Sequence, residues 1–181
     1  MKKALLIVDV QNDFVTGSLG SDYARDVIVP NIKSLAKEFD YRDRYATLDS
    51  HVDKDYLNSH EGKRLPIKHC IVGTKGHDLV KEIKRMIPSD PWHMILKGQF
   101  SVSHIDLYNA FTRGCGFGCD YDEIHVCGLV TDICVISNVL ALRSIFKEKD
   151  IIVHESCCAG TSKEAHDAAI KVMKSCQIDI V

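Results

Sequence analysis

The strongest constraint on the fold is the regular alternation, along the whole chain, of short apolar runs with segments of helical spacing. The apolar runs are too short for most helices and rich in β-branched residues, which is typical of buried parallel strands. Strand–helix–strand units connect by right-handed crossovers. The pattern therefore predicts an α/β fold of three layers, with a Rossmann-like parallel sheet of about six strands between two layers of helices. Strands are predicted at residues 4–10, 44–51, 93–100, 122–130, 150–157 and 177–181, and helices at 21–40, 76–87, 103–114, 133–150 and 162–176.

Size and charge narrow the class of protein. The 181 residues contain no repeat and no linker, so we expect one domain over residues 1–181. The net charge of −2 lacks the basic excess of proteins that bind nucleic acid or membrane surfaces. The apolar run ALLIV near the start is too short for a signal peptide. We therefore expect a cytoplasmic protein without a nucleic-acid or membrane partner.

Eight cysteines are present, and without an export signal we expect free thiols. Most of them are interpreted as small buried apolar residues. Cys115 and Cys119 have C-x3-C spacing, a poor match to zinc-ribbon spacing. No role is predicted for these two or for Cys157 and Cys158.

Four notable residues lie at the carboxyl ends of predicted strands, where parallel α/β sheets bind their ligands. Asp9 ends the first strand, Asp49 the second and Lys97 the third, and Cys134 follows the turn after the fourth. A buried carboxylate needs a partner or a raised pKa. Each residue alone has an ordinary explanation, such as a capped turn for Asp9 or a solvated stem for Lys97. Together they indicate a site.

Cys134 opens a predicted helix, a position that lowers a thiol pKa from its usual value of about 8.5. The free N–H groups of a helix start can also hold the oxyanion of a tetrahedral intermediate. The position suits a nucleophile. A structural cysteine at a helix start explains the position equally well.

Three segments, LLIVDVQNDF, ILKGQFS and GLVTDICV, resemble in this order the isochorismatase-like cysteine hydrolases, nicotinamidase (pyrazinamidase) type. The resemblance extends over essentially the whole chain. It implies the isochorismatase-like hydrolase fold, a catalytic triad of Asp9, Lys97 and Cys134, and hydrolysis of a linear amide through a thioester on Cys134. The implied substrate is nicotinamide, cleaved to nicotinate and ammonia in NAD salvage.

The resemblance also implies a cis peptide bond between Leu129 and Val130. That bond would direct the backbone N–H of Val130, with that of Cys134, at the oxyanion. We expect Phe14, Leu65, Phe100 and Leu129 in or near the substrate pocket. Leu65 stands where relatives have an aromatic residue, so the shape of the pocket is open.

A second group of polar residues lies in the segment TLDSHVDKDYLNSHEGKRLPIKHC. Asp49 and His51 are two residues apart and share one side of a strand. The resemblance implies a divalent metal on Asp49, His51 and His69, with zinc expected first and iron or manganese as alternatives. The fourth ligand is open: Leu57 occupies the position of a histidine in several relatives, Glu61 matches a glutamate in others, and His60 is its rival.

The predicted helix after Cys134 is apolar on more than one face, so it is buried in the domain or at a subunit contact. Relatives are commonly oligomeric, and we expect a homodimer or tetramer. Other functions stay open. A relative acting on another small amide or an N-carbamoyl substrate is the first alternative, and a non-catalytic thiol sensor or binding protein is the second.

Overall fold

The computed structural model describes residues 1–113 and 120–181. The described residues form one parallel six-stranded sheet, as predicted, with the strand order β3-β2-β1-β4-β5-β6. The strands are β1 (Lys3–Val8), β2 (Arg44–Asp49), β3 (Met94–Lys97), β4 (Glu123–Leu129), β5 (Asp150–Ala159) and β6 (Asp179–Ile180). Cys115 and Cys119, for which no role is predicted, lie outside the described residues.

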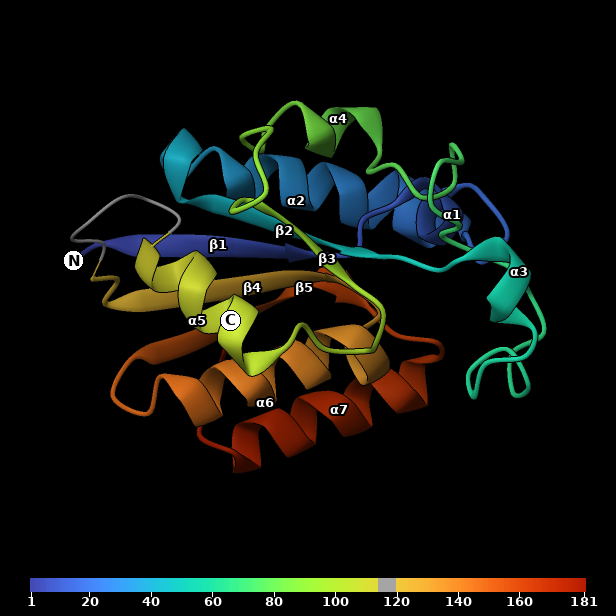
Figure 1. Cartoon of the computed structure of the whole chain (residues 1–181). Helices are drawn as coiled ribbons and strands as arrows, with labels where there is room; N and C mark the ends of the chain where they lie inside the picture. Colours follow the sequence, from blue (N-terminus) through green and yellow to red (C-terminus); the bar gives the residue numbers. More distant parts are fainter. Residues whose placement is uncertain (114–119) are drawn as a thin grey trace.

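Helices cover both faces of the sheet (Figure 1). Helices α1 (Asn12–Val15), α2 (Val29–Ala36) and α4 (Lys81–Lys84) lie on one face. Helices α5 (His104–Arg113), α6 (Ile136–Ile145) and α7 (Lys163–Ser175) lie on the other. The short α3 (Asp53–Tyr56) lies beyond the carboxyl ends of the strands (Figure 1). The three predicted layers are confirmed.

The central strand β1 is buried from Ala4 to Val8 and forms the middle of the apolar core. Its neighbour β4 approaches it closely at Gly128, where a Cβ atom would lie 2.2 Å from the carbonyl oxygen of Val8. Gly128 also has φ +128°, a conformation that other residues rarely adopt. Glycine is therefore required where β4 passes into the turn before Cys134.

The predicted helix over residues 76–87 is wrong in its first half, because only Lys81–Lys84 is α-helical. The backbone of residues 76–80 makes hydrogen bonds to residues 10–13 instead: Asp13 N–H donates to Gly76, Asn12 N–H to Asp78, and Val80 N–H to Val10. These long-range bonds use the backbone groups that a helix would need.

The predicted helix after Cys134 begins earlier, with a π-helical turn at Thr131–Val135 that continues into α6. Its apolar residues Val139 and Leu142 are buried within this chain. Helix α6 packs against α5, α7 and β5. Of the two explanations for its apolar faces, burial in the domain accounts for these residues. Among the described residues, no helix is both long and apolar enough to cross a membrane.

Candidate active site

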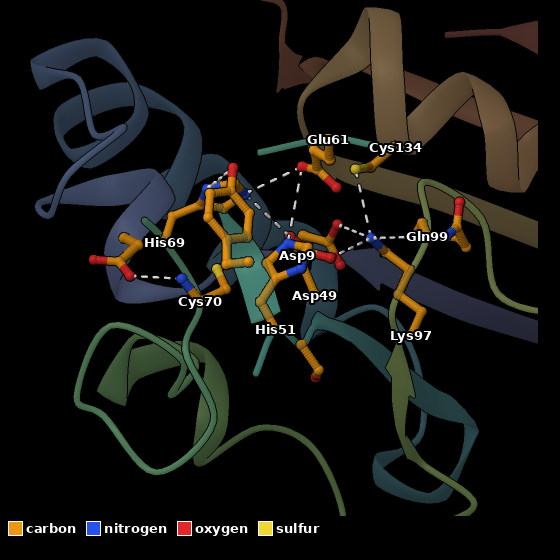
Figure 2. Close-up of polar contacts among 12 residues, drawn as sticks. Asp9, Asp49, His51, Glu61, His69, Cys70, Lys97, Gln99 and Cys134 are labelled. Atoms are coloured by element: carbon orange, nitrogen blue, oxygen red, sulfur yellow. Dashed lines mark hydrogen bonds and ion pairs between the residues drawn. The ribbon is translucent and has the colours of Figure 1, made fainter. Parts of the chain in front are cut away.

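Asp9, Lys97 and Cys134 come together at the carboxyl ends of β1, β3 and β4, as expected (Figure 2). The Lys97 Nζ lies 2.7 Å from Asp9 Oδ2 and 3.5 Å from Cys134 Sγ. All three residues are buried. Lys97 also donates to the carbonyl oxygen of Gln99 at 3.0 Å. A thiol, an ammonium group and a carboxylate thus lie together in one buried site.

Burial and neighbouring charges set the protonation of the three groups. Burial raises the pKa of Asp9, and the negative charge of Asp49 adds to this, while Lys97 partly offsets it. Burial alone would lower the pKa of Lys97, but the charges around it, above all that of Asp9, raise it. The lysine is therefore held as the ammonium ion, ready to stabilise a neighbouring anion.

The Cys134 thiol differs from the expectation drawn from its position at a helix start. Burial and the Asp9 carboxylate raise its pKa well above the usual range, and the attraction of Lys97 does not compensate. The resting thiol is therefore protonated. Attack by this sulfur requires a base, and Asp9 is the adjacent carboxylate.

The peptide bond between Leu129 and Val130 is cis, as expected. It lies between the end of β4 and the turn that carries Cys134. That turn is held by hydrogen bonds from the N–H groups of Ile133 and Val135 to the carbonyl oxygen of Val130. The role of the Val130 and Cys134 N–H groups toward an oxyanion stays a prediction.

The four expected metal ligands also converge, and they include Glu61. One ligand atom each of Asp49, His51, Glu61 and His69 lie within 4.8 Å of one another. The His51 Nε2 is 2.9 Å from Asp49 Oδ2, and the His69 Nε2 is 3.4 Å from the same oxygen. The rival ligand His60 has an exposed side chain, and Leu57 is likewise exposed. The cluster favours Glu61 as the fourth ligand.

This donor set fits a divalent ion such as zinc. Zinc binds histidine nitrogen and carboxylate oxygen at about 2.0–2.2 Å, so ligand atoms around it lie roughly 3–3.5 Å apart. The His69 Nε2 lies 3.5 Å from Glu61 Oε1, and the His51 Nε2 lies 3.8 Å from it. The His69 Nδ1 is 2.9 Å from the carbonyl oxygen of Ile67, a contact that fixes the ring and directs Nε2 inward.

The local fold explains why these ligands meet. The end of β2 pairs with residues 70–72, because the N–H of His51 donates to Cys70 O and the N–H of Val72 donates to His51 O. This pairing sets His51 beside His69. Burial alone would lower the pKa of His69, but hydrogen bonds with Asp49 and Glu61 raise it to about 10. A metal would have to displace the Nε2 proton.

Asp49 links the two groups of residues. Its Oδ2 faces the histidines, and its Oδ1 lies 3.5 Å from Lys97 Nζ. Burial alone would raise the pKa of Asp49, but hydrogen bonds with His51 and His69 and the charge of Lys97 lower it. Figure 2 shows this carboxylate between the lysine and the histidines.

Two buried residues that the sequence analysis did not single out hold the site in place. The Gln11 side chain is fully buried; its Nε2 donates to Asp49 O at 2.8 Å, and its Oε1 accepts from Asp49 N at 2.7 Å. Thr47 Oγ1 donates to Asp9 Oδ1 at 2.5 Å. Thr47 precedes Asp49 by two residues on a strand, so their shared side of the sheet was the available signal.

The expected pocket residues lie in different environments. The Phe14 ring is 5.4 Å from the His69 ring, and Leu129 is buried. Phe100 is exposed, and the carbonyl of Leu65 accepts a hydrogen bond from Tyr56 at 2.8 Å. Phe14 is thus beside the metal cluster, while the contribution of the other three to a pocket stays a prediction.

The site combines a buried thiol, an ammonium group and a carboxylate with a nearby four-ligand cluster. This arrangement, at the carboxyl ends of a parallel sheet, is suited to a hydrolase that uses a cysteine nucleophile. The chain belongs to the isochorismatase domain family, whose model matches residues 3–181. It is 31% identical to an uncharacterized isochorismatase family protein, PncA, from Bacillus subtilis, covering 94% of this chain and 93% of the relative. It is 27% identical to a nicotinamidase of Schizosaccharomyces pombe, covering 98% and 92%. A crystal structure of a Pyrococcus horikoshii pyrazinamidase in complex with zinc is similar in fold, with a TM-score of 0.77, 23% identity and coverage of 100% and 99%.

Proposed function

We propose that this isochorismatase-family hydrolase is a metal-containing cysteine amidohydrolase whose substrate is nicotinamide, cleaved to nicotinate and ammonia. The observation that carries the proposal is the contact of Lys97 Nζ with both Asp9 Oδ2 and Cys134 Sγ. The similarity to a nicotinamidase supports the choice of substrate.

The proposed first half of the reaction forms a thioester. Asp9 takes the thiol proton of Cys134, and Lys97 stabilises the thiolate. The sulfur attacks the amide carbonyl carbon, and the negative charge on the carbonyl oxygen is held by the N–H groups of Val130 and Cys134. Asp9 then gives its proton to the departing nitrogen, the C–N bond breaks, and ammonia leaves.

The second half releases the acid. Asp9 takes a proton from water, the hydroxide attacks the thioester carbonyl, and the C–S bond breaks. Cys134 recovers its proton from Asp9, which restores the resting state. A divalent metal held by Asp49, His51, Glu61 and His69 would supply a Lewis acid that helps orient the substrate. Zinc is proposed first, since the zinc-bound relative shares the fold.

Other small amides and N-carbamoyl amides are the alternative substrates. One observation favours testing them: Leu65 stands before Pro66, at a position where the resemblance implies an aromatic side chain. We also propose a homo-oligomer, which sedimentation would test; a clean monomer would contradict it.

The decisive experiment measures ammonia release from nicotinamide by the purified protein, with metal stripped and restored. Cys134→Ala should lower kcat at least about 10³-fold, because the covalent route is lost. Cys127→Ala is the matched control: its thiol is also fully buried, in β4, and its loss should cost about 1 kcal/mol of stability without changing kcat. Ammonia release that persists in Cys134→Ala would contradict the proposal.

A further inference from the structure

Asn138 lies in α6, one helical turn after Cys134, and its side chain is completely buried. Asparagine is a poor helix former and is costly to bury, so a buried asparagine here needs partners. It has three. Its Nδ2 donates to Cys134 O at 2.7 Å and to Phe100 O at 3.2 Å, and its Oδ1 accepts from Val102 N at 3.0 Å.

These contacts fix the orientation of the amide. Exchanging Oδ1 and Nδ2 would put an oxygen against two carbonyl oxygens and a nitrogen against an N–H group, so only one orientation satisfies all partners. Two of the partners belong to the loop of residues 98–103, which joins β3 to α5. The third belongs to the nucleophile itself. Asn138 therefore ties the helix of Cys134 to the loop that follows Lys97.

The same loop also contacts the Lys97 side chain. Lys97 Nζ donates to Gln99 O, one residue before the carbonyl that Asn138 holds. The loop is thus attached to Lys97 at Gln99 and to α6 at Phe100 and Val102. The 3.5 Å contact of Lys97 Nζ with Cys134 Sγ depends on two elements, and the Asn138 amide is a direct polar link between them.

We infer that Asn138 is a positioning residue, which holds the loop after Lys97 against the nucleophile's helix and so keeps the lysine ammonium at the Cys134 sulfur. The inference rests on the proposed function for its effect on turnover. It does not depend on the identity of the substrate, because the charge of Lys97 favours the Cys134 thiolate, which is the form that an alkylating agent attacks. A displacement of about 1 Å in a catalytic group can lower a rate about 10²-fold.

The test compares two Asn138 variants with a control on the same helix. Asn138→Asp keeps the shape and the acceptor for Val102 N–H but sets an oxygen against the carbonyls of Phe100 and Cys134. Asn138→Ser is uncharged and too short to reach the loop, while its hydroxyl can still donate to the carbonyl one turn back. Ser137→Ala is the control, because the Ser137 hydroxyl donates to the carbonyl oxygen of Ile133, one turn back in the helical segment that carries Cys134, and, within the described part of the chain, makes no link to the loop of residues 98–103.

Two rates are measured for each variant: ammonia release from nicotinamide, and iodoacetamide alkylation of Cys134 followed by peptide mass spectrometry. We expect both Asn138 variants to remain folded and to lose at least tenfold in kcat and in alkylation rate together, while Ser137→Ala stays within twofold of the parent protein. Alkylation unchanged in both Asn138 variants would overturn the inference, whatever happens to turnover. So would loss of the folded state in both, which would make Asn138 a stability residue.

The same data separate this inference from the proposed function. If the parent protein releases no ammonia from nicotinamide but alkylation still falls in both Asn138 variants, the positioning role stands and the proposed substrate fails. If turnover and alkylation fall together, both stand.

Discussion

Two buried polar clusters lie at opposite ends of the sheet, and they are built differently. The tyrosine cluster, at the amino ends of the strands, joins Tyr45, Tyr121 and Asp43: the two hydroxyls are 2.9 Å apart, and Tyr121 donates to Asp43 Oδ1 at 2.7 Å. The charged cluster, at the carboxyl ends, gathers six residues: Asp9, Lys97, Asp49, His51, Glu61 and His69.

The difference lies in where the charges are. In the tyrosine cluster, neutral hydroxyls separate Tyr45 from the single carboxylate, and burial raises the pKa of Tyr45 to about 12, so no proton moves near neutral pH. In the charged cluster, burial raises the pKa of Asp9, and this carboxylate shares the ammonium group of Lys97 with the Cys134 thiol. The first arrangement stabilises the sheet, and the second suits proton transfer.

The largest expected effect comes from changing the base of the charged cluster. Asp9→Asn keeps the side-chain shape, and we expect kcat for nicotinamide to fall about 10³-fold, because no carboxylate remains to take the Cys134 proton. The alkylation rate of Cys134 should change in the opposite direction and rise severalfold at pH 7. Asp9 raises the pKa of this thiol, and Lys97 remains beside it. A parallel fall of both rates would contradict the electrostatic effect of Asp9 on this thiol.

The second effect tests the metal ligands within the same cluster. Glu61→Gln should weaken zinc binding about 10- to 100-fold, because a neutral amide replaces a carboxylate ligand, and elemental analysis after dialysis should find less metal. His60→Gln is the matched control, since His60 is adjacent in sequence but exposed, and its metal content should equal that of the parent. The reverse result would make His60 the fourth ligand.

The contrast between local and long-range interactions explains which features the sequence could predict. Strand ends follow from local patterns, so Asp9, Asp49 and Lys97 were expected at one edge of the sheet, and the structure brings them together there. The helix predicted over 76–87 failed because residues 10–13 take its hydrogen bonds. The sequence predicted a lowered pKa for Cys134, which was wrong because burial and Asp9 raise this pKa and outweigh the effect of the helix start.

The same limit applies to Gln11 and Asn138. Each is a buried amide whose partners are distant in the sequence: 38 residues separate Gln11 from Asp49, and 36 separate Asn138 from Val102. No local pattern marks such partners. Glu61 was predicted only in part: the resemblance left the fourth metal ligand open, and the geometry of the cluster favours Glu61.

A smaller effect tests the role of the tyrosine cluster. Tyr121→Phe removes a hydroxyl that Tyr45 and Asp43 both contact, and we expect a loss of about 1–2 kcal/mol in the free energy of unfolding, measured with urea. Values of kcat and KM should remain within twofold, since the site is at the other end of the sheet. Tyr108→Phe, at an exposed tyrosine of α5, should leave both stability and activity unchanged. A large loss of activity in Tyr121→Phe would break the separation of the two clusters.

The smallest expected effect concerns a partly buried pair of histidines outside both clusters. His154 on β5 faces His125 on β4, with 2.8 Å between His154 Nε2 and His125 Nδ1. Burial, with a contribution from His125, lowers the pKa of His154 to about 4. The unfolded chain takes up this proton near the usual pKa of about 6.5, and the folded chain does so only near 4. Stability from this group is therefore complete above about pH 6.5 and is lost as the pH falls toward 4.

The loss should amount to about 1 kcal/mol, discounted because the side chain is only partly buried. Urea unfolding of the parent and of His154→Gln at pH 7 and pH 4.5 would measure it: the parent should lose more stability than the variant between the two pH values. His104→Gln, at an exposed histidine of α5, should follow the parent. Equal losses in parent and His154→Gln would mean that His154 takes up its proton equally in the folded and unfolded chain. A histidine that stays neutral at low pH would contrast with His69, whose pKa is raised to about 10 because carboxylates face it.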